Sequence, residues 1–228
     1  MKTNESYEYL MQLCKEYGYK DISSMLLDSI TYKHTGKMVN MASLSTSALD
    51  NAICNARRQQ PGSICQKCYA SSLIKQYSAL RNKLKRNMAI YSKVIIPWEQ
   101  LPLLNIAYFR IEAFGDVSNS TQCVNYINFI RKNRHIKFGW WSKNLNLIKT
   151  ALKRLGLSDL PSNCKMVYSE PVINCNDTTL DSIKQKYPFV DKIFIVRDDV
   201  EGSCGKNCFK CLTCYRSNEH NTVIEKLK

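Results

Sequence analysis

The sequence lacks a long apolar run. Its opening stretch, MKTNESYEYLMQ, is polar, and no segment approaches the ~20 consecutive apolar residues that a membrane-spanning helix needs. Repeats and segments rich in Pro, Gly or Ser are also absent, so a single folded domain is expected over residues 1–228. We therefore predict a cytoplasmic protein without membrane contact.

Acidic residues are scarce. Asp and Glu number 19 against 33 Lys and Arg, a formal net charge of +14. This excess favours a polyanionic partner, nucleic acid ahead of a membrane surface, although ionised cysteines would offset part of it. The helix predicted over 71–93 has a basic face that is either solvated or in contact with phosphate. That face carries Lys75, Arg81, Lys83, Lys85, Arg86 and Lys93.

Histidine is also scarce, whereas cysteine is abundant. The three histidines stand isolated, so none is expected to bind metal. The eleven cysteines are an odd number, and cytoplasmic thiols stay reduced, so clustered cysteines are expected to be metal ligands rather than disulfides. Seven of them form two groups: Cys54, Cys65 and Cys68 in the first, and Cys204, Cys208, Cys211 and Cys214 in the second. Cys123, Cys164 and Cys175 stand singly and are predicted to be core or loop residues.

The spacing within the two groups allows two kinds of metal. A CxxC pair lets two thiolates face one ion while backbone amides point at the sulfurs. Zinc would take four thiolates in a closed tetrahedron and would be structural. The four would come from the second group alone or from two CxxC pairs, one in each group. A [4Fe–4S] cluster explains the three cysteines of the first group, because three ligands leave one iron open to a substrate. We expect one or two such clusters, with zinc as the alternative.

Apolar spacing predicts two short helices before residue 32, then strands alternating with helices. The strands are predicted within 37–48 and over 106–114, 136–142, 165–172 and 192–198, and the helices over 71–93, 121–132, 145–155 and 180–187. This alternation indicates right-handed βαβ units and a parallel sheet. Five strands do not reach the eight of a closed barrel, so an α/β fold with a partial barrel or an open sheet is expected.

The predicted domain has three parts: N-terminal helices at 1–32, the partial barrel at 33–200, and a cysteine-rich, metal-binding module at 201–228. In a barrel or an open sheet, the functional face lies at the carboxyl ends of the strands. The first cysteine group follows the first strand and the second group follows the last. Both candidate metal groups are therefore expected on one face.

Polar loops end the other strands. Gly115 and Asp116 follow the second strand, Lys143 follows the third, and Ser169 ends the fourth. Each has a plain structural alternative, since Gly-Asp is a common turn and Lys143-Asn144 can cap the next helix. Arg110 and Glu112, at alternate positions of one strand, can likewise form a buried ion pair.

Five segments together resemble the phage and plasmid "gene product eighty-eight" family, over most of the chain from about Lys33 to Tyr215. They are GKMVNMASLSTSALDNAICNARRQQPGSICQKCYA, FRIEAFGDV, WSKN, PSNCKMVYSEPVIN and CGKNCFKCLTCY. A second, weaker similarity is to phage proteins whose cysteine loop ends Cys-x-x-Cys-Tyr-Ala and whose partial barrels resemble radical S-adenosylmethionine enzymes. If the chain is phage-encoded, its location is the host cytoplasm.

The second resemblance implies a cofactor site. Gly115 and Asp116 would receive the methionine amine of S-adenosylmethionine, and Glu112, Lys143 and Ser169 would be polar groups of the same pocket. The radical enzymes usually carry CxxxCxxC, with an aromatic residue just before the last cysteine. In the first group here, ten residues separate the first two cysteines, and the aromatic residue, Tyr69, comes just after the last cysteine. The CxxxCxxC spacing occurs instead at Cys204, Cys208 and Cys211, which we interpret as an auxiliary centre.

Two functions compete. The first is an iron–sulfur enzyme of the radical type that acts on nucleic acid or nucleotides. The alternative is a zinc-stapled basic protein that binds nucleic acid without catalysis. No motif identifies a substrate or an oligomeric state.

Overall fold

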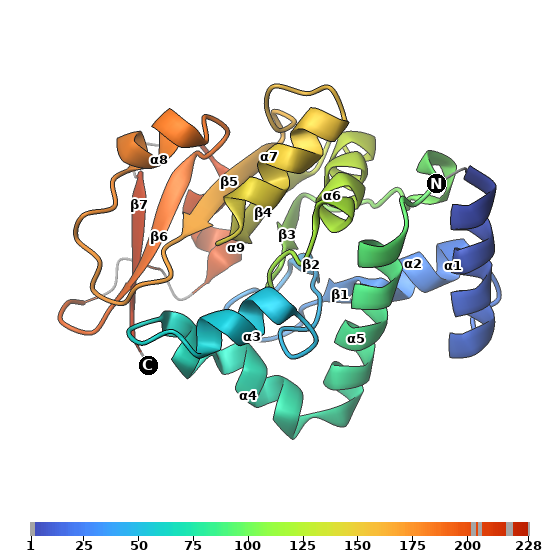
Figure 1. The fold of residues 1–228 in the computed structure, drawn as a ribbon, viewed down its shortest axis with the longest axis horizontal. Coiled ribbons are helices and arrows are strands. Elements are labelled where there is room, and N and C mark those ends of the chain that lie inside the picture. Colours follow the sequence, from blue (N-terminus) through green and yellow to red (C-terminus); the bar gives the residue numbers. More distant parts are fainter. Residues whose placement is uncertain (1–2, 202–203, 205–206, 218–220, 228) are drawn as a thin grey trace.

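The fold is an α/β arrangement around a seven-stranded sheet (Figure 1). The computed structural model describes residues 3–201, 204, 207–217 and 221–227. Strands β2 to β7 are parallel and lie in the order of the sequence, while β1 pairs antiparallel with β2. The strands are β1 (Thr31–Tyr32), β2 (Ala42–Leu44), β3 (Tyr108–Ile111), β4 (Lys137–Ser142), β5 (Cys164–Ser169), β6 (Lys192–Arg197) and β7 (Thr222–Lys226).

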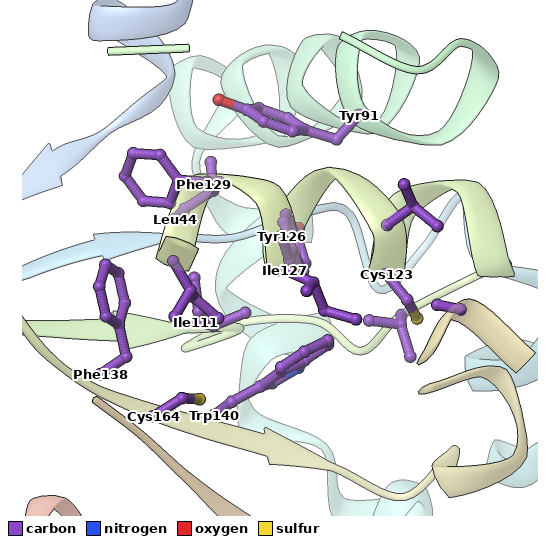
Figure 2. Close-up of a cluster of buried hydrophobic side chains, with 14 of the residues drawn as sticks. Leu44, Tyr91, Ile111, Cys123, Tyr126, Ile127, Phe129, Phe138, Trp140 and Cys164 are labelled. Carbon is purple, nitrogen blue, oxygen red and sulfur yellow. The ribbon is translucent and has the colours of Figure 1, made fainter. Parts of the chain in front are cut away.

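Helices cover one face of this sheet and enclose the main core. Phe109, Ile111, Phe138 and Trp140 point from β3 and β4 towards α6, where they contact side chains of that helix. Figure 2 shows α6 between these strands and Tyr91 of α5. The larger helices are α1 (Thr3–Tyr17), α2 (Ile22–Ser29), α3 (Ala52–Arg58), α4 (Tyr69–Gln76), α5 (Ser78–Lys93), α6 (Ser120–Lys132), α7 (Leu145–Arg154) and α8 (Leu180–Lys186).

The C-terminal cysteine segment covers the second face. Its helix α9 (Cys208–Cys211) and 3₁₀ turn η3 (Thr213–Tyr215) place Leu212 and Tyr215 against Trp141 and Val167 of the sheet. A Cβ on Gly139 would lie 2.9 Å from the Tyr215 ring and 2.7 Å from that of Trp141. Glycine at this position therefore lets the Tyr215 ring approach the strand.

Most of the predicted elements are confirmed, including the two N-terminal helices and the alternation from β3 to β6. The helix predicted over 71–93 is wrong as a single element, because Tyr77 is extended (φ −115°, ψ 106°) and separates α4 from α5. The strand predicted within 37–48 is only Ala42–Leu44. Strand β7, which pairs with β6 along its whole length, was not predicted from the sequence.

The single cysteines lie where predicted. Cys123 and Cys164 are buried in the main core (Figure 2), and Cys175 is half-buried in the loop after β5. No disulfide joins any of the described cysteines.

Candidate functional site

The first cysteine group lies at the carboxyl edge of the sheet. Its segment follows β2 and folds into α3, the 3₁₀ turn η1 (Ile64–Lys67) and the start of α4. The Asn51 side chain caps α3 by accepting hydrogen bonds from the N–H groups of Ile53 and Cys54, and its Nδ2 donates to the carbonyl of Asp116. Cys54 is therefore held in the first turn of α3, beside the loop that follows β3.

The segment also crosses the ends of the neighbouring strands. Arg57 donates to the carbonyl of Lys143 after β4, at 3.0 Å. Further along, Ile64 N–H donates to the carbonyl of Pro171 and Ile173 N–H donates to that of Gly62, after β5. These contacts make the cysteine segment a cover over the carboxyl ends of three parallel strands, and Figure 1 shows α3 beneath those strand ends.

The three thiols of this group share one half-buried neighbourhood. Burial raises the pKa of Cys54, and the nearby Asp116 carboxylate and Cys65 sulfur raise it further. Cys54 and Cys68 both pack against a small apolar cluster around Ala48 and Ile74. Across the described residues, however, no group of three or more His, Cys, Asp or Glu side chains is arranged to hold a metal ion.

The second cysteine group lines a cavity of about 370 Å³ on the second face of the sheet. All four of its cysteines border this cavity, together with Lys37, Arg110 and Trp141. The Arg110 guanidinium lies 3.9 Å from the centre of the Trp141 ring. Burial raises the pKa of Cys214 to about 12, while the positive charge of Arg110 acts against that shift. Two cations therefore face a site where thiolates would carry negative charge.

Glu112 does not share a strand face with Arg110. Strand β3 ends at Ile111, and Glu112 has a positive φ of 55°, so the predicted ion pair between them is wrong. Its buried carboxylate instead accepts hydrogen bonds from Tyr126 O–H (2.6 Å), from Gln122 Nε2 (2.8 Å), and from the hydroxyl (2.7 Å) and N–H (3.1 Å) of Thr46. Burial raises the pKa of Glu112 to about 7.

Gly115 and Asp116 join neighbouring loops. The Asp116 carboxylate accepts from Ser142 O–H at 2.6 Å and from Lys143 N–H at 2.9 Å, which ties the loop after β3 to the loop after β4. A Cβ on Gly115 would lie 2.5 Å from the Thr46 carbonyl oxygen, so glycine permits this close approach. Asp116 lies near Cys54, but its carboxylate is already engaged by these two hydrogen bonds within the protein.

Lys143 and Ser169 follow the paired residues Ser142 and Tyr168 of the neighbouring strands β4 and β5. Lys143 borders a second cavity, of about 310 Å³, between α3, α7 and α8. Ser169 is buried at the end of β5, opposite Phe194 of β6. The structure therefore brings Asp116, Lys143 and Cys54 together, whereas Glu112 turns towards α6.

The predicted basic face is partly used inside the protein. Arg86 pairs with Asp28, Lys83 donates to the carbonyl of Ile30, and Arg81 donates to the carbonyl of Lys75. Half of its six cations are therefore engaged in holding α2, α4 and α5 together. This reduces the area of basic surface on α5 that could contact phosphate.

Several residues of this edge were not predicted from the sequence. Arg57 and Asn144 connect the cysteine segment to the loop after β4, at 2.9 Å between Arg57 Nη2 and Asn144 Oδ1. Thr46 and Gln122 complete the network around Glu112. The one signal in the sequence was position, since Asn144 lies in the loop that follows the predicted strand 136–142 and Thr46 lies near the end of the segment 37–48 in which a strand was predicted.

Comparison of the chain with protein-family models, with curated proteins and with solved structures found no match. No helix in the described part of the chain is both long and apolar enough to span a membrane.

Proposed function

We propose that the protein is a thiolate-ligated metalloprotein of the partial-barrel type, an iron–sulfur enzyme acting on a nucleotide or nucleic acid. The observation that carries the proposal is the position of the first cysteine group: it directly follows the first parallel strand and lies over the carboxyl ends of its neighbours. Catalytic residues of β/α barrels occupy that edge.

The order of the strands supports a partial barrel. In a doubly wound sheet the order of the strands reverses at a switch point, whereas the strands of a barrel follow one another in sequence order. Here β2 to β7 keep sequence order, with the large helices on one face. The second face then corresponds to the interior of the barrel, which is where the second cysteine group lies.

The donor set suits an iron–sulfur cluster in its chemistry. Cys54, Cys65 and Cys68 would hold it, and all three are half-buried thiols. When bound, such a cluster with one open iron supplies electron transfer to S-adenosylmethionine. Among the protein's own groups, Asn51 orients Cys54, and Asp116 with Ser142 holds the neighbouring loop in place.

A zinc-stapled nucleic-acid-binding protein is the second candidate. The observation that favours it is the second cysteine group, whose four cysteines line one cavity and equal in number the four thiolates of a closed zinc site. Arg110 and Lys37 would offset the charge of four thiolates there. In this version the net charge of +14 provides the binding to phosphate.

Metal analysis of protein purified without oxygen tests the proposal. We expect iron with acid-labile sulfide, part of which is lost in Cys65→Ala together with any cleavage of S-adenosylmethionine. Cys175→Ala is the matched control, because Cys175 is half-buried in a loop outside both groups, and it should keep the full metal content. Zinc without sulfide would exclude the enzyme and leave the second candidate.

A further inference from the structure

The cavity of about 310 Å³ between α3, α7 and α8 has the features of a small-molecule site. It opens at the carboxyl ends of β4 and β5, the edge where ligands of parallel sheets bind. Its volume is at the lower end of the range for ligand pockets. None of the seven grouped cysteines lines it.

Two cations line the cavity. Hydrogen bonds from Nη2 of Arg57 to the Lys143 carbonyl and to Asn144 Oδ1 fix its guanidinium. Its Nη1 is buried and has no hydrogen-bond partner within the described part of the chain. Lys143 also borders the cavity, and no described carboxylate forms an ion pair with its ammonium group. A fixed guanidinium with a donor to spare is a typical anion-binding group.

Two carboxylates near the cavity are engaged elsewhere. Glu170 accepts from Val172 N–H at 3.0 Å and from Thr178 O–H at 2.7 Å. Asp116 accepts from Ser142 O–H and Lys143 N–H. Neither acid neutralises Arg57 or Lys143 by a direct ion pair among the described residues.

The start of α7 adds to the positive character of the cavity. Asn144 is the N-cap residue, but its side chain makes no cap hydrogen bond. Its Oδ1 accepts from Arg57 and its Nδ2 donates to the Val117 carbonyl instead. The first turn of α7, which lines the cavity, therefore lacks a side-chain acceptor for its N–H groups.

The remaining walls are aromatic and apolar. Tyr168, Tyr187 and Ile183 line it, and so does Ile53 of α3. The Tyr187 hydroxyl donates to Asn146 Oδ1 at 2.7 Å, which holds its ring in place. A ligand with an anionic head and a flat or apolar body complements both parts of the cavity. We infer that this cavity binds a small phosphate monoester with a planar ring, of the nucleoside monophosphate class.

Calorimetric titration of the full chain with adenosine monophosphate tests this inference, with inorganic phosphate and acetate as comparison ligands. We expect one site per chain, with adenosine monophosphate binding more tightly than phosphate and acetate binding least. Lys143→Gln and Arg57→Gln should each weaken adenosine monophosphate about tenfold or more, as expected when a charge-assisted contact is lost.

Lys153→Gln is the matched control. It removes the same charge from an exposed position of α7 outside the cavity, so it should leave the affinity unchanged. Circular dichroism checks that each variant is folded. Because Arg57 also donates hydrogen bonds to Lys143 and Asn144 of the loop after β4, its loss can disturb that loop, so Lys143→Gln is the deciding variant. Failure of adenosine monophosphate to bind at millimolar concentration, equal affinity for acetate, or equal weakening by Lys153→Gln would each overturn the inference.

Discussion

Glu112 illustrates how one residue can join several elements. It follows β3 in a left-handed conformation that non-glycine residues rarely adopt, and it reaches Thr46 after β2 as well as Gln122 and Tyr126 of α6. Four donors surround its carboxylate, yet burial still raises its pKa to about 7. The hydrogen bonds offset part of the cost of burying the carboxylate but do not remove it.

The raised pKa of Glu112 predicts a pH-dependent stability. Between its ordinary value of 4.5 and about 7, the unfolded chain has released this proton while the folded chain still holds it. The folded state binds more protons in that window, so the free energy of unfolding should fall as the pH rises through it, by roughly 3 kcal/mol, and then level off. Urea unfolding at pH 5 and at pH 8 measures this difference.

The variant Glu112→Gln separates this carboxyl from other titrating groups. Its side chain stays neutral at every pH, so most of the difference between pH 5 and pH 8 should disappear. Exposed Glu99 provides the control, since Glu99→Gln should keep the difference. An unchanged pH dependence in Glu112→Gln would show that Glu112 is not its source.

At the scale of elements, α6 organises the connections around it through buried asparagines. Asn125 accepts from Ile96 N–H at 2.9 Å and donates to the carbonyls of Tyr91 and Val94. Asn133, at the end of the helix, accepts from Leu104 N–H and donates to the Pro102 carbonyl. The irregular chain between α5 and β3 is therefore hydrogen-bonded to one helix.

We expect Asn125→Ala to destabilise the protein by about 2–4 kcal/mol, because it leaves the buried Ile96 N–H and two carbonyls without partners. Asn128→Ala, on the same helix but half-buried, removes only a weak contact of 3.5 Å with Arg131 and should cost less than about 0.5 kcal/mol. Urea unfolding measures both. Similar losses in the two variants would argue against the role given to Asn125.

At the scale of the whole molecule, the C-terminal segment returns to the beginning of the sheet. Lys37 Nζ lies 2.9 Å from the Glu225 carboxylate, and Cys208 N–H donates to the Lys37 carbonyl. Strand β7 extends the parallel sheet beyond β6, and Val223 is buried there. The cysteine segment is thus held between the second face of the sheet and the strand that comes after it.

Removal of residues 216–228 should make the protein aggregate. The deletion takes away β7 and leaves one edge of β6 unpaired. Strand β6 itself carries the apolar residues Ile193, Ile195 and Val196. Size-exclusion chromatography with light scattering detects the change. Glu225→Gln is the control, because it keeps β7 and removes only a partly exposed ion pair, worth about 0–1 kcal/mol. A monomeric truncated chain would contradict the prediction.

Local patterns in the sequence determined most of the elements and the positions of the two cysteine groups. Helices α6, α7 and α8 and strands β3 to β6 were predicted within a few residues, because apolar spacing and turn residues act over short stretches of chain. The placement of the first cysteine group after a strand came from the same patterns.

Only the tertiary structure decided how those pieces meet. Tyr77 interrupts a continuous helical pattern. Strand β7 pairs with β6 although no pattern in the sequence predicted a strand there. Glu112 turns to α6 because of one backbone conformation. Arg57 is one of many basic residues in the sequence, and becomes a candidate ligand group only where Lys143 and the start of α7 border the same cavity. Such juxtapositions depend on contacts between residues far apart in the chain, which no local pattern encodes.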